Sequence, residues 1–294
     1  MKSGFVSFIG RPNAGKSTLL NRLVGEKLAI VSDKPQTTRT RILGVKNYPD
    51  AQVVFLDTPG IHRPLHRMNV RMVDTALDTI KEVDVLGLVV DANEPAGKGD
   101  KFVFDLVKGA KAPVVLILNK VDLMKKTRLL PIIERYAKEG TFADIVPISA
   151  STGENVERLE QVLLERLPEG EAMYPADYLT DQPERFFAAE IVREKLLQFT
   201  HAEIPFSSAV VIDRFEEPAE GSRLLRLYCS IVVDRESHKP IVVGRGGEMI
   251  KKIGTAAREE LERFFDTKVF LDLHVRVKSE WREDDGMLGE LGLK

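Results

Sequence analysis

Short apolar runs alternate with helix-like patterns along the first half of the chain. These runs are Phe5 to Ile9, Val53 to Leu56, Val85 to Val90, Val114 to Leu118 and Ile145 to Ile148. Strands that are apolar on both faces and separated by helices are typical of a mostly parallel sheet. Another strand, Arg41 to Lys46, is joined to Val53 by a turn-rich connection too short for a parallel crossover. We therefore predict an α/β domain whose sheet has one antiparallel edge strand.

The pattern changes after residues 169–182, a stretch with prolines, a glycine and little periodicity. The elements expected beyond it are a helix from Pro183, strands Ser207 to Phe215 and Arg223 to Val233, two helices, and a last strand, Lys268 to Val277. Alternating apolar residues in the second of these strands predict one buried face, and Cys229 lies on that face. We therefore predict a second, α+β domain.

Length and composition agree with two domains in a globular protein. The chain has 294 residues, so we place a first domain at 1–168, a linker at 169–182 and a second domain at 183–294. No apolar run approaches the ~18 residues that span a bilayer, and the start lacks the pattern of a signal peptide. With Cys229 as its single cysteine, the chain has no disulfide framework. We expect a cytoplasmic protein, and its net charge of -2 leaves room for a local basic face.

The first chemical motif is a phosphate loop between the first strand and the first helix. The motif consists of Gly10, Arg11, Pro12, Asn13, Ala14, Gly15, Lys16 and Ser17, followed by Thr18. Its glycines allow backbone N–H groups to surround phosphates, and the helix N-terminus adds positive potential. Lys16 would reach the outer phosphates and Ser17 would bind Mg²⁺. The sequence therefore predicts a nucleoside triphosphate site.

A second motif, Asp57-Thr58-Pro59-Gly60, follows an apolar strand at the end where α/β sheets place their ligands. We expect Asp57 to reach Mg²⁺ through water and the Gly60 N–H to contact the γ-phosphate. A glycine there also allows the following loop to move when that phosphate leaves. The pair of motifs therefore predicts a nucleotide switch.

The third motif, Asn119-Lys120-Val121-Asp122, indicates which base is bound. The Asp122 carboxylate can accept hydrogen bonds from N1 and N2 of guanine, a pair of donors that adenine lacks. We expect Asn119 to brace neighbouring loops and the Lys120 stem to cover the base. The segment Ser149-Ala150 would offer a backbone N–H to the guanine carbonyl. We therefore predict GTP as the substrate.

A polar, basic stretch at residues 33–41 lies between the first two motifs and has the profile of a mobile loop. We assign it as the first switch. Thr38 is our choice for the threonine that contacts Mg²⁺, with Thr37 and Thr40 as the alternatives.

The phosphate loop, the segment Thr37-Thr38-Arg39 and the second motif together resemble the TrmE-Era-EngA group of GTPases. Ile61 follows Gly60, where Ras-like enzymes have a glutamine that orients the attacking water. In members of the group a potassium ion near the phosphate-loop asparagine replaces an arginine finger. The resemblance thus implies a potassium site at Asn13, with a purely loop-stabilising role for that side chain as the alternative.

The second domain contains a Gly-x-x-Gly turn between its last two helices. The element order around this turn resembles a type II KH domain, a fold that binds single-stranded RNA where its glycines allow close approach of the RNA backbone. Basic residues surround the turn, with Glu248 the main acid among them. The predicted RNA-binding residues are Lys239, Ile241, Gly244, Arg245, Gly246, Gly247, Lys251, Lys252 and Arg258. The alternative is a glycine connector in a domain that only docks proteins.

Taken with both domains in this order, the resemblance covers essentially the whole chain and implies a ribosome-assembly GTPase. It implies that the KH domain reads the 3′ end of small-subunit ribosomal RNA and that the protein acts on the 30S subunit, as a monomer and without a DNA partner. It also implies peripheral contact with the inner membrane. Because no side-chain base is identifiable, a GTP-binding module without hydrolysis is the competing hypothesis.

Overall fold

The computed structural model describes residues 1–61, 64–94, 98–139, 142–221 and 223–293. The chain divides into two compact units. The first comprises Met1–Leu65 and Asn69–Asp181, and the second comprises His66–Met68 and Gln182–Lys294. Within the described ranges, no helix is both long and apolar enough to cross a membrane.

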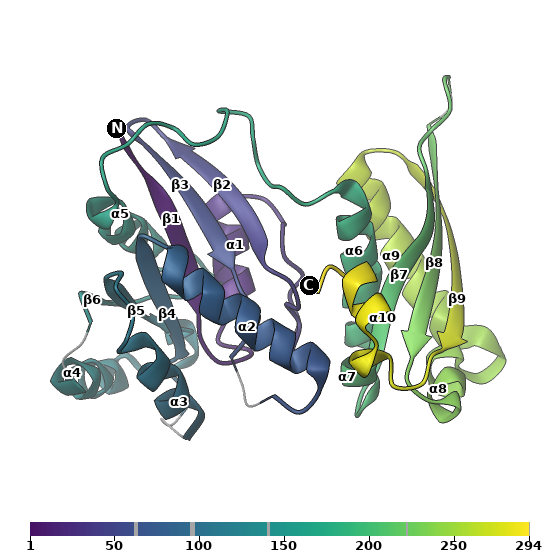
Figure 1. The fold of residues 1–294 in the computed structure, drawn as a ribbon, viewed down its shortest axis with the longest axis horizontal. Helices are drawn as coiled ribbons and strands as arrows, with labels where there is room; N and C mark the ends of the chain where they lie inside the picture. The colour runs from purple at the N-terminus through teal and green to yellow at the C-terminus, as the bar shows by residue number, and fades with distance from the viewer. Residues whose placement is uncertain (62–63, 95–97, 140–141, 222, 294) are drawn as a thin grey trace. The chain divides into compact units, whose positions relative to one another are not determined.

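A six-stranded sheet forms the centre of the first unit, in the order β2-β3-β1-β4-β5-β6 (Figure 1). The strands are β1 (Lys2–Ile9), β2 (Ile42–Tyr48), β3 (Ala51–Asp57), β4 (Val85–Asp91), β5 (Val114–Asn119) and β6 (Asp144–Pro147). Among the described strands of this six-stranded sheet, only β2 runs antiparallel to its neighbour, β3. The predicted mostly parallel sheet with one antiparallel edge is therefore confirmed.

Helices cover both faces of this sheet. They are α1 (Lys16–Val24), α2 (Arg67–Glu82), α3 (Lys98–Val107), α4 (Leu129–Glu139) and α5 (Val156–Arg166), with short 3-10 turns η1 (Val121–Leu123) and η2 (Lys126–Arg128). Figure 1 shows α2 in front of the sheet and α1 behind it. Ala76 of α2, Phe104 of α3 and Tyr136 of α4 share one buried cluster with the sheet residues Ile9 and Leu88. Burial on both faces explains why the strands read as continuous apolar runs.

The segment that follows α5 is attached to the first unit by backbone and side-chain hydrogen bonds. Val45 of β2 donates its N–H to the carbonyl of Leu179, 2.8 Å away. The fully buried Gln52 accepts from the N–H groups of Met173 and Tyr174 at 2.7 and 3.0 Å and donates to the Tyr174 carbonyl at 2.8 Å. The assignment of residues 169–182 as a linker stays a prediction. The sequence did not indicate that part of this segment is bonded to β2 and β3.

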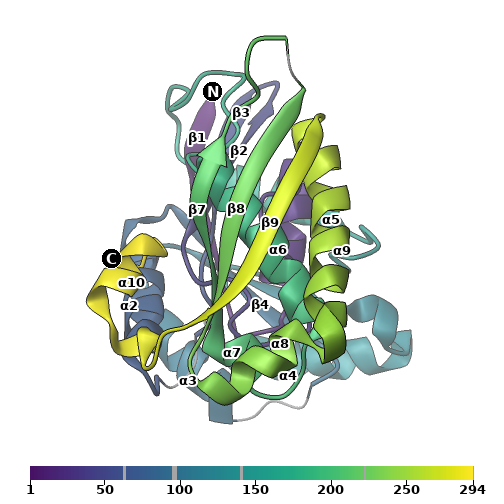
Figure 2. The ribbon, with the colours of Figure 1, turned by 90° about the vertical axis from the view of Figure 1, so that its right-hand side faces the viewer.

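The second unit contains a three-stranded sheet in the order β7-β8-β9. Its elements are α6 (Glu184–Phe199), α7 (Ile204–Ser207), β7 (Ser208–Glu216), β8 (Leu224–Val233), η3 (Glu236–His238), α8 (Lys239–Val243), η4 (Arg245–Gly247), α9 (Glu248–Phe265), β9 (Lys268–Val277), η5 (Trp281–Glu283) and α10 (Asp285–Glu290). Figure 2 shows the three strands side by side, with α9 running along β9. The predicted order of helix, two strands, two helices and strand is present, and Cys229 is buried in the core as the alternation predicts.

The C-terminal tail of the second unit packs onto the domain through Trp281, as that residue type suggests, and ends in a short helix that the sequence patterns did not reveal. Trp281 is fully buried and donates its indole N–H to the Ser207 carbonyl at 2.9 Å. Asp284 caps α10, accepting from the Met287 N–H at 2.7 Å. The acid therefore begins a helix whose Met287 and Leu288 are buried.

Candidate functional site

The phosphate loop connects β1 to α1 in a conformation that depends on its glycines. Gly15 has φ +96°, and a Cβ there would lie 2.2 Å from Nδ2 of Asn119. A Cβ at Gly10 would lie 2.3 Å from the Val89 carbonyl oxygen. A side chain at either position would displace the loop from the neighbouring strands.

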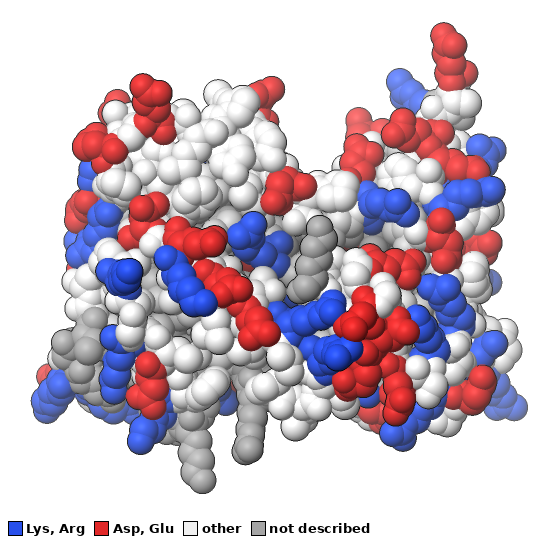
Figure 3. All heavy atoms as spheres, in the orientation of Figure 1, with Lys and Arg blue, Asp and Glu red and all other residues white. Residues whose placement is uncertain are grey.

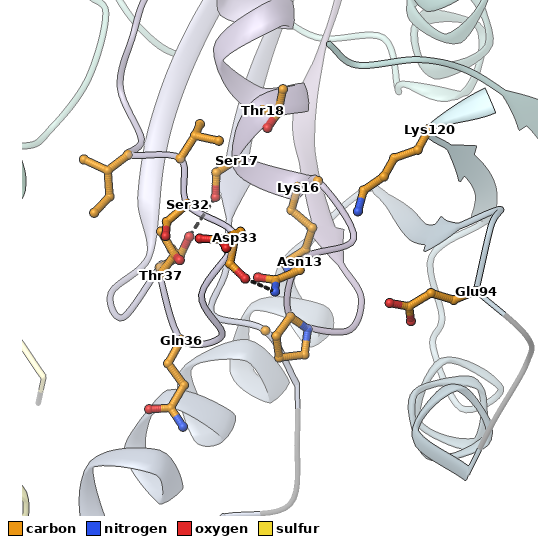
Figure 4. A pocket seen from close by; sticks show the side chains of 16 residues that line it. Asn13, Lys16, Ser17, Thr18, Ser32, Asp33, Gln36, Thr37, Glu94 and Lys120 are labelled. Carbon is orange, nitrogen blue, oxygen red and sulfur yellow. Dashed lines mark hydrogen bonds between the residues drawn. The ribbon is translucent and has the colours of Figure 1, made fainter. Parts of the chain in front are cut away.

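A cavity of about 400 Å³ opens beside this loop (Figure 4). That volume lies within the ~300–1,000 Å³ usual for small-molecule sites. Its lining includes nine of the predicted site residues: Pro12, Asn13, Gly15, Lys16, Ser17, Thr18, Thr38, Gly60 and Lys120. Sequence reasoning missed Ile30, Val31 and Glu94, which also line it. No chemical motif marks those three positions.

Lys16 is buried at the base of the cavity. Its Nζ donates to the carbonyl of Arg11 at 3.1 Å and more weakly to that of Gly10 at 3.4 Å. Burial lowers the pKa of Lys16, and the Asp57 carboxylate opposes that shift. Among the described residues, only neutral carbonyls accept its protons, so an anionic phosphate would be a stronger partner for the ammonium.

The oxygen atoms of three predicted metal ligands meet in one place. The Ser17 hydroxyl lies 2.8 Å from that of Thr38 and donates to Oδ2 of Asp57 at 2.7 Å. Oδ1 of Asp57 is buried and has no hydrogen-bond partner within the described chain. Burial raises the pKa of Asp57, while Lys16 and the two hydroxyls oppose the shift. Convergent hard oxygens with one unpaired carboxylate atom fit Mg²⁺.

The geometry separates the three candidate threonines of the first switch. Thr38 is buried, and its hydroxyl also lies 3.2 Å from Oδ2 of Asp57. Thr37 instead donates its hydroxyl to the Lys34 carbonyl at 2.6 Å. Thr40 makes no comparable contact among the described residues. Thr38 alone is therefore positioned beside Ser17 and Asp57.

The second motif is fastened to the first. Thr58 donates its hydroxyl to the Phe8 carbonyl at 3.0 Å, and the Ile61 N–H donates to the Gly10 carbonyl at 3.2 Å. A Cβ at Gly60 would lie 2.9 Å from Cα of Pro12. Ile61 is only 2% exposed and packs in the apolar core. Its side chain therefore points away from the cavity and leaves that position without a group to orient water.

Asn13 joins the phosphate loop to the first switch. Its backbone has φ +64°, a conformation that asparagine tolerates better than most residues. Its Nδ2 donates to the carbonyl of Asp33 at 2.5 Å, a contact drawn in Figure 4. The Asn13 side chain thus connects the two loops directly.

Asn119 braces two loops from the end of β5. It is 2% exposed, its Nδ2 donates to the Ala14 carbonyl at 2.8 Å, and its Oδ1 accepts from the Ala150 N–H at 2.9 Å. The expected bracing contacts are therefore present. Asp122, in η1, is exposed, whereas Ser149 is buried.

Residues at the end of β4 hold Lys120, and sequence reasoning missed them. Nζ of Lys120 lies 2.7 Å from Oδ2 of Asp91, and Nδ2 of Asn93 donates to the Lys120 carbonyl at 2.9 Å. Burial acts to raise the pKa of Asp91, but hydrogen bonds from Lys120 and Asn93 outweigh it, so the pKa is lowered. The signal available in the sequence was their position, since β4 and β5 end at the same sheet edge.

Arg22 of α1 supports the loop after β6, a further contact that no motif indicated. Its Nε donates to the Ala150 carbonyl at 3.1 Å, and a second guanidinium N–H donates to the Ser151 carbonyl. The predicted base loop is thereby held from both α1 and β5.

The glycine turn of the second unit lies between α8 and α9. Gly244 has φ +76°, and a Cβ there would lie 2.6 Å from the Met249 backbone nitrogen. Gly246 and Gly247 also have positive φ, of +59° and +85°, but a Cβ on either meets nothing within 4 Å. Gly244 is thus required by the turn itself, while the other two glycines leave open space for a ligand.

All five of the predicted basic residues around this turn are exposed. They are Lys239, Arg245, Lys251, Lys252 and Arg258. Ile241, on α8, is 47% exposed. Lys252 differs from the others because its Nζ lies over the Phe199 ring of α6, 4.3 Å from the centroid. Its contact is therefore made within the fold.

The fold and both sites define a P-loop GTPase joined to a KH domain. Residues 5–120 match the family model described as a 50S ribosome-binding GTPase, and residues 203–282 match the KH domain model. GTPase Era of Geobacter metallireducens is 52% identical over 291 residues, covering 99% of this chain and 97% of that protein. GTPase Era of Staphylococcus haemolyticus is 46% identical with the same coverage. The chain belongs to the GTPase Era family.

Two solved Era structures resemble the whole chain. A point variant of Aquifex aeolicus Era bound to GDP and AlF4- has a TM-score of 0.95 and 41% identity, covering 100% of this chain and 99% of its own. Era in complex with MgGDPNP and nucleotides 1506–1542 of 16S ribosomal RNA has a TM-score of 0.96, with the same identity and coverage. The agreement extends over both units of the chain.

Proposed function

We propose that the first unit binds Mg²⁺ and GTP in the cavity beside the phosphate loop and hydrolyses GTP to GDP and phosphate. The convergence of Ser17, Thr38 and Asp57 carries this proposal, because it brings residues from three separate motifs to one point. Bound Mg²⁺ would supply charge neutralisation at the phosphate oxygens.

The remaining residues act by positioning and charge. Backbone N–H groups of residues 13–17 cradle the phosphates, and Lys16 exchanges its carbonyl partners for phosphate oxygens. Asp122 accepts from the guanine edge, while Asn119 holds the loops on either side of the base. With Ile61 buried, hydrolysis proceeds without a side chain from that position.

A potassium ion at Asn13 is part of this proposal. The asparagine already joins the phosphate loop to the switch loop, so its amide oxygen lies at the loop junction where a monovalent cation would neutralise phosphate charge. Hydrolysis should then run faster in potassium than in sodium buffer, and Asn13→Ala should remove the difference. Equal rates in the two buffers would leave Asn13 as a loop brace only.

We further propose that the KH domain binds the 3′ end of small-subunit ribosomal RNA and that the protein acts in assembly of the 30S subunit. Support comes from the open glycines at 246 and 247, the exposed cations nearby, and the Era relative bound to a 16S segment. We place the domain limits at 1–168 and 183–294, and the protein as a cytoplasmic monomer with peripheral inner-membrane contact.

Coupling between the two domains follows from linkage. GTP raises affinity for RNA only if it favours the domain arrangement that RNA favours, and RNA must then raise affinity for GTP by the same factor. Affinity for a non-hydrolysable GTP analogue measured with and without RNA tests this coupling. Single-turnover hydrolysis tests the reaction itself, and absence of any phosphate release would support the inert module.

A paired glycine variant tests the RNA site. Gly246→Asp with Gly247→Asp should fold, because both positions are open and Asp tolerates positive φ. Its affinity for the 3′-end RNA should fall at least about tenfold, because carboxylates would face the phosphates. Its affinity for GTP should be unchanged. Wild-type RNA affinity in this variant would refute the KH assignment.

A further inference from the structure

Positive charge is concentrated in one segment of the first unit. Residues 101–138 contain nine Lys and Arg against three Asp and Glu, whereas the whole chain has 43 against 45. Figure 3 shows Lys and Arg atoms gathered over α3 and α4, at the lower left of the picture. Asn119, Lys120 and Asp122 in this segment belong to the nucleotide site, but its other Lys and Arg residues do not line the cavity.

The centre of this charge is a set of side chains on η2 and α4. We call it the α4 basic face, and it consists of Lys125, Lys126, Arg128, Arg135 and Lys138, all exposed. Lys126 has Glu154 at 3.8 Å, an exposed ion pair that contributes little in water. Within the described residues, no acidic side chain lies at ion-pair distance from Lys125 or Arg128. These cations are therefore available to an external anion.

Two apolar side chains flank the same surface without serving the core. Leu123 is 69% exposed and Leu130 is 67% exposed. The core contacts of α4 are made instead by Leu129, Ile132 and Tyr136. An exposed leucine alone is ordinary, but two beside a group of exposed cations are typical of a contact surface.

We propose that the α4 basic face binds the phosphate backbone of RNA, at a segment separate from the one held by the KH domain. This inference rests on the proposed RNA-binding function. The cations continue along α4, an 11-residue helix that is ~16 Å long, so they form a stripe that can follow a backbone. Leu123 and Leu130 would pack against ribose or base faces at its edge.

An anionic lipid surface, the alternative partner, fits the α4 basic face less well than RNA. A helix that lies in a membrane interface buries a continuous apolar face in the lipid. The apolar face of α4 is already committed to the protein core, which leaves only the two leucines for insertion. Charge is thus the main feature available for recognition, and in RNA it is arranged along a line.

The test compares two double charge reversals in the full chain. Lys125→Glu with Arg128→Glu removes part of the α4 basic face, and Lys81→Glu with Arg158→Glu makes the same charge change elsewhere on the first unit. Each protein is titrated with a short 3′-end RNA and with full small-subunit ribosomal RNA, over a range of salt concentrations.

We expect the α4 variant to bind the short RNA like the wild type and the full RNA about tenfold more weakly. Its salt slope on the full RNA should fall by about 1.5 to 2, because two phosphates would no longer be neutralised by the protein. The Gly246→Asp, Gly247→Asp variant should instead lose affinity for the short RNA. Its residual binding to the full RNA should disappear when the α4 changes are added.

Equal affinities and slopes for the α4 variant and its control on the full RNA would overturn the proposal. If the α4 variant lost binding to phosphatidylglycerol vesicles but kept wild-type affinity for both RNAs, the α4 basic face would bind lipid and the proposal would be overturned. If instead the wild type bound neither RNA, the proposed function itself would fail, an outcome distinguishable from failure of the α4 face alone.

Discussion

Asn119→Ala should weaken the first unit and its nucleotide site together. The change leaves the Ala14 carbonyl and the Ala150 N–H without their buried partner. An unsatisfied buried polar group costs about 1 to 3 kcal/mol. Because water can enter part of the space left by the side chain, we expect the two groups together to lower the free energy of unfolding by about 2 to 4 kcal/mol. GDP affinity should fall at least about tenfold, since the loops on both sides of the base lose their shared brace.

The second unit provides an internal control for this experiment. Its only tryptophan, Trp281, is buried in the second unit, so tryptophan fluorescence reports the unfolding of that unit. Far-UV circular dichroism reports both units. In urea, the transition of the first unit should move about 1 to 2 M lower, while the tryptophan transition stays in place.

Asn47→Ala serves as the matched comparison. The exposed Asn47 donates to the Ala176 carbonyl at 2.9 Å and accepts from Nε2 of Gln52 at 2.9 Å, and without it Gln52 keeps its donor bond to the Tyr174 carbonyl. That variant should lose less than about 1 kcal/mol. If Asn119→Ala moved the first transition no further than Asn47→Ala, or moved the tryptophan transition equally, the bridging argument would be refuted.

Three further outcomes follow from the structure. Asp122→Asn should weaken GTP at least about tenfold and favour xanthine nucleotides, which carry an acceptor where guanine has its amino group; retained guanine preference in competition binding would contradict this. Thr38→Ala should raise the Mg²⁺ concentration for half-maximal hydrolysis about tenfold, whereas Thr40→Ala should not, and equal shifts would exclude Thr38 as the ligand. Burial raises the pKa of Cys229 to about 12 from 9.0, so its thiolate is disfavoured in the fold. Alkylation at pH 8 should therefore require unfolding, and stability should fall as pH rises from 9 toward 12; rapid labelling of the native protein would show that Cys229 is not enclosed.

The sequence predicted the parts of this protein that local chemistry determines. Alternation in β8 indicated the buried face that contains Cys229, and the short connection after β2 required an antiparallel edge. The phosphate loop was recognisable because its glycines are needed where they stand: Gly15 faces Asn119 at a distance that no side chain allows. Such requirements are encoded in residue type and spacing.

Interactions that depend on the three-dimensional neighbourhood were missed. Asp91 is an ordinary strand-end acid until β4 and β5 place it 2.7 Å from Lys120. Choosing among three threonines required the position of Thr38 relative to Asp57, which only the folded chain provides. The capped helix α10 was not predicted, because a six-residue helix with an Asp284 cap and a buried Met287 is too short to show a helical period.

The attachment of residues 173–179 to β2 and β3 has a mechanical consequence. β2 begins at Ile42, four residues after Thr38, and its Val45 N–H is bonded to Leu179, three residues before the second unit resumes at Gln182. Any shift of Thr38 on loss of the γ-phosphate would pull on a strand whose outer edge carries the chain leading to the KH domain. The edge strand β2 is thus joined at its start to the switch loop and along its outer edge to the segment that precedes the second unit.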